Sequence, residues 1–285
     1  MLAEILDGKA LSEENLLLMK EELFELIKTT NKRPKLAIIL VGDNASSIAY
    51  VEKKKQALDL VGCEYQEFLF GKNVSTDELI LKIEDLNNDN QFHGILVQLP
   101  LAPQIIEEDV IHAISPEKDV DGFTSYNMGN LVLGKESEIY PPCTPLGVIK
   151  LLEHYEISVE GKEIVVIGRS HIVGKPLAIM LSNRNATVTL CHSKTKNISF
   201  HTIRADILCV AVGKKDFLKG EMIKKDAVVI DVGFSRDENG SISGDVNFEE
   251  VLKKASYLTP VPGGVGPMTV SCLVENLIKA FKKTI

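Results

Sequence analysis

The sequence predicts a two-domain α/β protein in which helices cover parallel sheets. Its 285 residues are about twice the commonest domain size. Short apolar runs alternate with segments of helical spacing, which is typical of β-α-β units with parallel strands. A rigid, proline-rich stretch at residues 141–145 separates two series of these units. We therefore expect one α/β domain over residues 1–140 and a Rossmann-type domain over residues 141–269.

The first half begins with a predicted amphipathic helix. Residues 12–15 (SEEN) form a helix-start signal. The apolar positions that follow are Leu16, Leu17, Leu18, Leu23, Phe24 and Ile27. Residues 35–42 (KLAIILVG) are a continuous apolar run closed by a glycine, which predicts a buried parallel strand. The next expected elements are a helix over 50–60, a strand over 63–70, a helix over 75–88 and a strand over 93–99.

The second half has the strand spacing of a Rossmann-type sheet. Its four strand candidates are residues 163–167, 186–190, 207–212 and 227–232. Residues 269–283 then predict an amphipathic helix. The apolar stripe of this helix is Val270, Leu273, Val274, Leu277, Ile278 and Phe281.

Composition excludes several classes of partner. The formal net charge of −8 argues against a nucleic-acid binder, which usually presents a basic face. No apolar run approaches the roughly 18 residues that a membrane span requires. The N-terminus lacks the positive region of a signal peptide. We therefore expect a cytoplasmic protein with no nucleic-acid or membrane partner.

The cysteines and histidines predict no metal site. The five cysteines are scattered and none has C-x-x-C spacing, so neither a zinc site nor a disulfide framework is indicated. The six histidines show no H-x-x-x-H spacing. We expect buried, reduced thiols.

A candidate nucleotide site lies at residues 164–176 (IVVIGRSHIVGKP). A strand, a glycine turn and a helix start place backbone N–H groups and a partial positive charge where a pyrophosphate can bind. The pattern is G-x-S-x-x-x-G rather than G-x-G-x-x-G, so the motif alone is weak. Its position between a predicted strand and a predicted helix strengthens it.

The end of the next strand favours NADP over NAD. Residues 189–195 (TLCHSKT) lack the acid that NAD sites usually place there to bind the ribose. Arg169, Ser193 and Lys194 instead offer donors and positive charge for a 2′-phosphate. The alternative is that Arg169 and Lys194 are ordinary surface charges.

Tyr50 and Lys54 form the first candidate for chemistry. Four residues apart on a helix, they share a face, so a phenol and an amine can reach one substrate. From spacing alone, a solvated lysine face over residues 53–55 is the commoner explanation. Short-chain dehydrogenases use the same spacing, but there the pair follows the glycine-rich turn. Here it precedes that turn by more than a hundred residues, which excludes that family.

Gln98 and Asp121 are the other candidate polar residues. Gln98 lies in an otherwise apolar strand, where an amide is costly to bury unless it is hydrogen-bonded. Asp121 follows in a loop-like stretch, residues 118–123 (KDVDGF). Each also has a structural explanation, since Gln98 could cap a sheet edge and Asp121 could hold an Asx-turn.

Taken together, these residues resemble the bifunctional methylenetetrahydrofolate dehydrogenase/cyclohydrolase family. The segment at residues 259–269 (TPVPGGVGPMT), with three glycines and three prolines in eleven residues, is highly specific. The matching segments are VGDNASSIAYVEKKK (41–55), GILVQLPL (94–101), SPEKDVDGF (115–123), PPCTPLG (141–147), GRSHIVGKP (168–176), CHSKT (191–195), DVG (231–233) and TPVPGGVGPMT (259–269).

The resemblance implies roles in folate chemistry. Lys54 resembles the catalytic lysine, with Tyr50 stacking on or orienting the folate. Gln98 resembles the residue that hydrogen-bonds this lysine, and Asp121 the carboxylate that anchors the pterin. The implied wall of the folate site also includes Leu99, Pro262 and Gly263.

The resemblance also implies the cofactor and the assembly. The cofactor is NADP, and no metal is implied. The implied NADP contacts are Thr144, Gly168, Arg169, Ser170, Ile172, Val173, Gly174, Ser193, Val212, Gly213, Val232, Gly233 and Thr269. The family pattern predicts that a C-terminal helix at 270–285 completes the first domain and that the active-site cleft lies between the domains. It also implies tetrahydrofolate substrates and a homodimer.

The expected reactions are two. Oxidation of 5,10-methylenetetrahydrofolate needs orientation and cofactor proximity, with no general base. Hydrolysis to 10-formyltetrahydrofolate needs proton transfer, which a partly buried lysine can supply. The alternatives are a monofunctional dehydrogenase of the same family and a non-catalytic NADP or folate sensor. Three positions depart from the family pattern without removing a group used in the chemistry: Asn44, Ala102 and His171.

Overall fold

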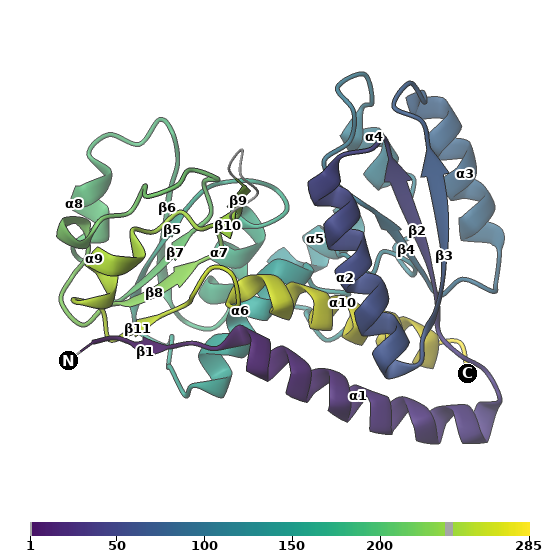
Figure 1. Ribbon diagram of the computed structural model, residues 1–285, viewed down its shortest axis with the longest axis horizontal. Helices are drawn as coiled ribbons and strands as arrows, with labels where there is room; N and C mark the ends of the chain where they lie inside the picture. The colour runs from purple at the N-terminus through teal and green to yellow at the C-terminus, as the bar shows by residue number, and fades with distance from the viewer. Residues whose placement is uncertain (1, 237–241) are drawn as a thin grey trace. The chain divides into compact units, whose positions relative to one another are not determined.

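The chain folds into two compact units, each described here by itself. The computed structural model describes residues 2–236 and 242–285. The three-stranded unit comprises Glu13–Pro141 and Val270–Ile285, and the six-stranded unit comprises Met1–Ser12 and Pro142–Thr269. Both units combine helices with a parallel sheet (Figure 1), so the predicted α/β fold class is confirmed.

The three-stranded unit has the parallel strand order β3-β2-β4. Two helices, α1 (Gly8–Thr30) and α10 (Val265–Lys282), each contain a boundary between the units. The other elements are β2 (Lys35–Val41), α2 (Ala45–Val61), β3 (Glu64–Phe70), α3 (Thr76–Asn88), β4 (Gly94–Val97), α4 (Glu107–His112) and α5 (Ser125–Val132).

Strand β2 is apolar throughout because both of its faces are covered. Alternate residues Ala37, Ile39 and Val41 belong to one hydrophobic cluster with the buried residues of α3. Leu36 and Ile38 point to the opposite face and are fully buried as well. A central parallel strand buried on both faces has no polar alternation, which is why residues 35–41 form a continuous apolar run.

Helix α2 begins earlier than its apolar spacing predicts, at Ala45 rather than Tyr50. The side chain of Asn44 accepts hydrogen bonds from the backbone N–H groups of Ser46 and Ser47, at 3.0 and 3.1 Å. An asparagine at this position satisfies N–H groups that have no partner within the helix. Asn44, one of the departures from the family pattern, therefore fixes the start of α2.

Helix α1 is present, but its apolar face is narrower than expected. Leu16 and Leu23 are buried, whereas Leu17, Leu18 and Phe24 are each more than half exposed. The predicted helix is therefore present, but its apolar residues do not all lie on the buried face.

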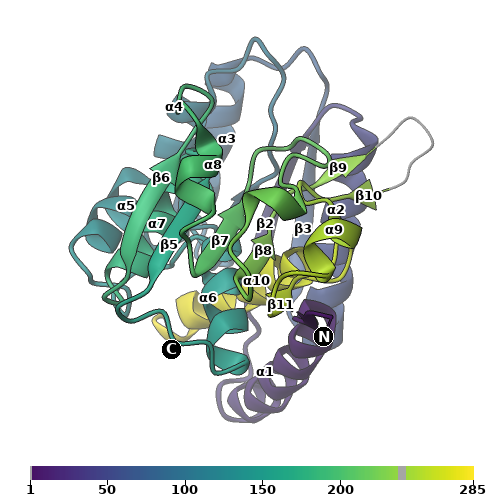
Figure 2. The ribbon, with the colours of Figure 1, turned by 90° about the vertical axis from the view of Figure 1, so that its left-hand side faces the viewer.

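The main sheet of the six-stranded unit has the strand order β1-β11-β8-β7-β5-β6, and all its neighbouring strands are parallel. Strands β9 and β10 form a separate antiparallel pair. Strands β5 to β8 are the four predicted Rossmann strands, and Figure 2 shows them from a second direction. The elements are β1 (Glu4–Ile5), α6 (Cys143–His154), β5 (Glu163–Ile167), α7 (Gly174–Ser182), β6 (Thr187–Cys191), α8 (Ile198–Thr202), β7 (Ile207–Val210), η1 (Gly220–Met222), β8 (Val228–Asp231), β9 (Ser235–Arg236), β10 (Ile242–Ser243), α9 (Phe248–Leu252) and β11 (Tyr257–Leu258).

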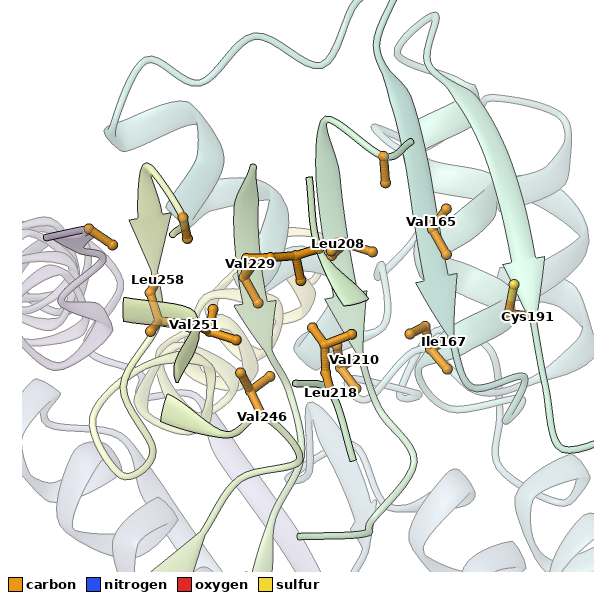
Figure 3. Close-up of a cluster of buried hydrophobic side chains, with 14 residues drawn as sticks. Val165, Ile167, Cys191, Leu208, Val210, Leu218, Val229, Val246, Val251 and Leu258 are labelled. Atoms are coloured by element: carbon orange, nitrogen blue, oxygen red, sulfur yellow. The ribbon is translucent and has the colours of Figure 1, made fainter. Parts of the chain in front are cut away.

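One face of this sheet carries a continuous hydrophobic cluster. Val165 and Ile167 of β5 lie beside Leu208 and Val210 of β7, followed by Val229 of β8 (Figure 3). Each of these side chains is at most 4% exposed. The cluster holds the carboxyl ends of β5, β7 and β8 in a fixed row, and ligands of open α/β sheets bind at this edge.

The sequence predicts that the first domain begins at residue 1. In the structure, residues 1–12 group with the six-stranded unit instead. Glu4 and Ile5 pair in parallel with Tyr257 and Leu258. The backbone N–H of Leu6 donates to the carbonyl of Leu258 at 3.0 Å. Because these backbone groups complete the edge of the six-stranded sheet, the N-terminal segment is part of that unit.

The proline-rich stretch at 141–145 is not extended throughout. The units divide between Pro141 and Pro142, but α6 already begins at Cys143. Pro145 is tolerated in the first turn because an N–H there would have no acceptor within the helix.

Helix α10 begins at Val265, four residues before the predicted start, and its residues from Val270 group with the three-stranded unit. The Asn276 side chain donates to the carbonyls of Val120 and Pro141, at 2.9 and 3.0 Å. The Lys279 ammonium donates to the carbonyl of Ile139 at 2.6 Å.

The five cysteines are all buried and none of them forms a disulfide, in agreement with the expected reduced thiols. Among the residues described, none of the helices has the length and apolar character needed to cross a bilayer.

Candidate active site

Lys54 lies on the buried face of α2. The buried positions of this helix are Ser47, Val51, Lys54, Ala57, Leu58 and Val61. Their spacing is that of one helical stripe, so a lysine occupies a position where an apolar residue would ordinarily pack. The Lys54 side chain is only 4% exposed. An ammonium in this position requires polar partners because burying an isolated charge is costly.

Gln98 supplies one of these partners. The Lys54 ammonium donates to Gln98 Oε1 at 3.0 Å, and Gln98 Nε2 donates to the carbonyl of Leu99 at 2.8 Å. The second bond fixes the orientation of the amide, so its oxygen faces the lysine. Gln98 comes directly after β4 rather than inside it, and its backbone N–H donates to Ile39. The amide therefore lies at the carboxyl end of the parallel sheet.

The three consecutive lysines have three different environments. Lys53 is exposed. Lys55 forms ion pairs with Glu52 at 3.0 Å and Glu67 at 2.6 Å, and its hydrogen bonds to both carboxylates raise its pKa. Only Lys54 is buried, so the solvated-face explanation does not hold for this residue.

Tyr50 lies beside the lysine, as the i, i+4 spacing predicts. Its side chain is half-buried, and the Lys54 nitrogen lies 5.2 Å from the centre of the Tyr50 ring. This distance is within the range of a cation–π contact. Tyr50, Lys54 and Gln98 thus form one cluster, the lysine cluster.

The turn at 118–123 is held by Asp119, which the sequence analysis does not single out. Its carboxylate accepts hydrogen bonds from the backbone N–H groups of Gly122, Phe123 and Thr124 at 2.7 to 3.1 Å. Asp119 is 1% exposed, whereas Asp121 is half-buried. The carboxylate shown to accept from the backbone of this turn is therefore that of Asp119.

The glycine turn of the six-stranded unit is very tight. Gly168 follows β5 with φ of 120°, and a Cβ atom there would lie 2.2 Å from the carbonyl oxygen of Ala211. A Cβ atom on Gly174, the first residue of α7, would lie 1.9 Å from the carbonyl oxygen of Gly168. No side chain fits at either position. The close approach of backbone to backbone is the geometry of a dinucleotide turn.

Ser170 organises the start of α7. Its hydroxyl oxygen accepts hydrogen bonds from the backbone N–H groups of Val173 and Gly174, at 3.2 and 3.4 Å. As an acceptor in both bonds, the hydroxyl keeps its own hydrogen for a further partner. Ile172 and Val173 are half-buried in the same turn.

Arg169 and Ser193 lie at the same edge of the sheet. Both are exposed, and they follow β5 and β6, whose last residues Ile167 and Cys191 are partners in register. Hydrogen bonds within residues 192–195 fix the loop that carries Ser193. The acid typical of NAD sites is absent from this loop, so the guanidinium of Arg169, the hydroxyl of Ser193 and the ammonium of Lys194 are the groups available to a ribose substituent.

The remaining predicted cofactor residues lie at the carboxyl ends of β7 and β8 or at two helix starts. Val212 and Gly213 follow β7, and Val232 and Gly233 follow β8. The Thr144 hydroxyl is 3.0 Å from that of Thr269, although 125 residues separate them. Pro262 and Gly263 come shortly before α10 in the six-stranded unit.

A buried lysine–amide pair in one α/β unit and a dinucleotide turn in another define a class, the two-domain nucleotide-dependent α/β enzymes. Residues 6–121 match the sequence profile "Tetrahydrofolate dehydrogenase/cyclohydrolase, catalytic domain". Residues 142–285 match the profile "Tetrahydrofolate dehydrogenase/cyclohydrolase, NAD(P)-binding domain". The chain belongs to the tetrahydrofolate dehydrogenase/cyclohydrolase family.

Individual relatives agree over the whole chain. The bifunctional protein FolD of Bacillus licheniformis is 51% identical over 285 residues, which cover 100% of this chain and 99% of that protein. The crystal structure of the bifunctional FolD dehydrogenase/cyclohydrolase from Campylobacter jejuni has a TM-score of 0.96 at 48% identity, covering 99% of this chain and 100% of that one. The Trypanosoma brucei FolD, solved with NADP cofactor and an inhibitor, has a TM-score of 0.95 at 36% identity, covering 100% and 99%.

Proposed function

We propose that this protein oxidises 5,10-methylenetetrahydrofolate with NADP and hydrolyses the resulting methenyl compound to 10-formyltetrahydrofolate. The observation that carries the proposal is the buried Lys54–Gln98 pair in a member of this family. A monofunctional dehydrogenase has no evident use for a lysine placed in the core of α2 at the cost of its desolvation.

For the oxidation, the protein supplies position rather than proton transfer. NADP held at residues 168–174 would supply the acceptor for a hydride from the bridging methylene carbon, and the lone pairs of the adjacent folate nitrogens would assist the departure of this hydride. Residues 168–174 fit the cofactor because their backbone is packed too tightly for side chains and presents a helix start. Tyr50 orients the folate ring, and Leu99, Pro262 and Gly263 contribute further contacts to the folate. Asp121 accepts hydrogen bonds from the pterin amino and ring N–H groups.

For the hydrolysis, Lys54 moves the protons. Water adds to the methenyl carbon and loses a proton to the Lys54 amine, so this step requires the neutral lysine. The carbon–nitrogen bond to the ring nitrogen N5 then breaks, and this nitrogen takes up a proton from the Lys54 ammonium. The hydroxyl proton of the intermediate is released as the formyl carbonyl forms, which leaves one proton in solution per turnover. The amide of Gln98 holds the nitrogen of Lys54 in place and accepts from its charged form.

We further propose a homodimer in the cytoplasm. Five buried cysteines, none of them in a disulfide, suit a reducing compartment. Sedimentation equilibrium of the purified protein measures the assembly, and a monomer at micromolar concentration would contradict this part of the proposal.

Two assays test the proposed function. Purified protein is mixed with 5,10-methylenetetrahydrofolate and NADP, and reduced cofactor is followed. In a second cuvette, the protein is mixed with methenyltetrahydrofolate without cofactor, and loss of its absorbance is compared with buffer. Activity in both is expected. Activity in the first alone would indicate the monofunctional alternative, and activity in neither would indicate a binding protein.

Cofactor selectivity provides a test of Arg169. We expect Arg169→Ala to raise KM for NADP by roughly tenfold to a hundredfold, because a charged hydrogen bond to the 2′-phosphate is lost. KM for NAD, which lacks this phosphate, should change less than about threefold. Arg204→Ala is the matched control, because Arg204 is an exposed arginine of the same unit whose guanidinium stacks on Phe200. Equal changes of both KM values in Arg169→Ala would contradict the assignment.

Replacing the neutral amide of Gln98 with a carboxylate tests whether Gln98 acts on Lys54. We expect Gln98→Glu to lower the hydrolysis of methenyltetrahydrofolate at neutral pH by roughly a hundredfold. A carboxylate beside Lys54 would hold the lysine in its charged form, so it could not accept a proton from water. Gln66→Glu, at an exposed position of β3, is the control. A wild-type hydrolysis rate in Gln98→Glu would show that Gln98 does not act on Lys54.

A further inference from the structure

Two buried carboxylates lie where β7 and β8 end in the six-stranded unit. Asp231 is the last residue of β8, and Asp245 follows β10. Their side chains are 4% and 0% exposed. Neither is assigned to substrate or cofactor in the proposed function. Two acids in a core are costly to bury, so their hydrogen bonds indicate what they do.

Asp245 holds the loop after β7. Its Oδ2 accepts from the backbone N–H groups of Val212 at 2.6 Å and Gly213 at 3.0 Å, and its Oδ1 accepts from the N–H of Lys214 at 2.7 Å. Three consecutive N–H groups converging on one anion form a nest. Because a side chain of the protein already fills this nest, the N–H groups of residues 212–214 are not available to a cofactor phosphate. These three residues can contact a cofactor through their side chains and carbonyl oxygens.

Asp231 holds Asp245. One oxygen of the Asp231 carboxylate accepts from the backbone N–H groups of Gly233 at 2.9 Å and Asp245 at 3.0 Å, and the other accepts from Val246 at 2.9 Å. The loop after β8 and the segment after β10 therefore share one anchor. A Cβ atom on Gly233 would lie 2.2 Å from the Asp245 carboxyl carbon, so the fit around the acids leaves no room for a side chain.

The charges explain why so many donors are needed. The pKa of Asp231 is raised to about 6, chiefly by burial; the hydrogen bonds from the three backbone N–H groups lower it, and the charge of Asp245 adds to the rise. Six backbone N–H groups in total compensate the two acids. The desolvation cost is thus offset only when the loops after β7 and β8 keep this particular conformation.

We propose that Asp245 is a positioning residue for NADP, acting through the loop at 212–214, and that Asp231 positions Asp245. The inference rests on the proposed function and on the NADP contacts predicted from the sequence for Val212, Gly213, Val232 and Gly233. Neither acid contacts the cofactor. Each acid fixes the backbone conformation of a loop whose residues contact the cofactor. Neither acid has a role in the hydrolysis of methenyltetrahydrofolate.

The test is Asp245→Asn, which keeps the shape of the side chain and replaces one acceptor oxygen with a donor. The amide nitrogen must face at least one backbone N–H, so the loop loses its conformation. We expect KM for NADP to rise at least about tenfold and kcat at saturating NADP to change less than about threefold, because the chemistry is unaltered. Cofactor-independent hydrolysis of methenyltetrahydrofolate should remain at the wild-type rate. Asp231→Asn should show the same pattern with a smaller rise, and it serves if Asp245→Asn does not fold.

Asp206→Asn is the matched control. Asp206 is a carboxylate of the same unit that accepts from the backbone N–H of Glu163 at 3.0 Å, at the amino end of β5. This variant should leave KM for NADP unchanged even if its Tm falls. An unchanged KM in both Asp245→Asn and Asp231→Asn, or a parallel loss of hydrolysis and NADP affinity, would overturn the inference. Wild-type protein without NADP-dependent oxidation would instead refute the proposed function itself.

Discussion

Lys54→Met is expected to lower the hydrolysis of methenyltetrahydrofolate by roughly a thousandfold while leaving a substantial part of the dehydrogenase activity. The lysine is the group proposed to transfer protons, and such groups typically contribute factors of this size. Methionine fits a position on the buried face of α2 and needs no hydrogen-bond partner, so the fold should tolerate the change. Oxidation needs no general base and depends on orientation, so it should lose far less.

Both activities of this variant are measured on the same preparation. The matched control is Lys53→Met, which makes the same substitution at the exposed neighbour and should leave both activities unchanged. A folded Lys54→Met protein that loses both activities equally would contradict the claim that Lys54 is needed for the hydrolysis and not for the oxidation. Retention of hydrolysis would show that a group other than Lys54 transfers the proton.

Gly174→Ala is expected to have the second largest effect. A Cβ atom on residue 174 would lie 1.9 Å from the carbonyl oxygen of Gly168. Because this oxygen belongs to the backbone, the clash cannot be relieved by the rotation of a side chain. We expect the turn to open, the affinity for NADP to fall by about a hundredfold or more, and the free energy of unfolding to fall by roughly 1–3 kcal/mol. Titration of NADP by calorimetry and a denaturant melt measure the two quantities.

The control for this substitution is Gly129→Ala. Gly129 lies in α5 with no atom within 4 Å of its would-be Cβ atom. Alanine there should stabilise the protein by about 0.5–1 kcal/mol through helix propensity. If Gly174→Ala bound NADP with wild-type affinity, the turn at 168–174 would not be the cofactor site.

The sequence was sufficient to predict what depends on local pattern. Strand β2 was predictable because both of its faces are buried, and α3 because Ser75 and Glu78 form a capping box. The i, i+4 spacing placed Tyr50 beside Lys54. Burial of Lys54 was not evident from spacing. The sequence alone does not show which of the three consecutive lysines faces the sheet, and only the folded structure identifies Lys54 as the buried one.

The features that were missed depend on contacts between distant residues. Asp119 and Asp121 lie two residues apart in one motif, and only the folded turn shows which carboxylate the backbone N–H groups surround. Asp245 meets a loop more than thirty residues earlier in the chain, which no local pattern encodes. The N-terminal strand β1 has two residues, and only its pairing with β11 assigns it to the six-stranded unit.

The central claim is that one chain couples an NADP-dependent oxidation to a hydrolysis carried by Lys54. The most direct measurement is a progress curve with 5,10-methylenetetrahydrofolate and NADP that follows reduced cofactor and methenyltetrahydrofolate together, in the wild type and in Lys54→Met. We predict that the wild type forms reduced cofactor with little methenyl compound, and that the variant accumulates methenyl compound in step with reduced cofactor. Accumulation to the same extent in both proteins would contradict the claim.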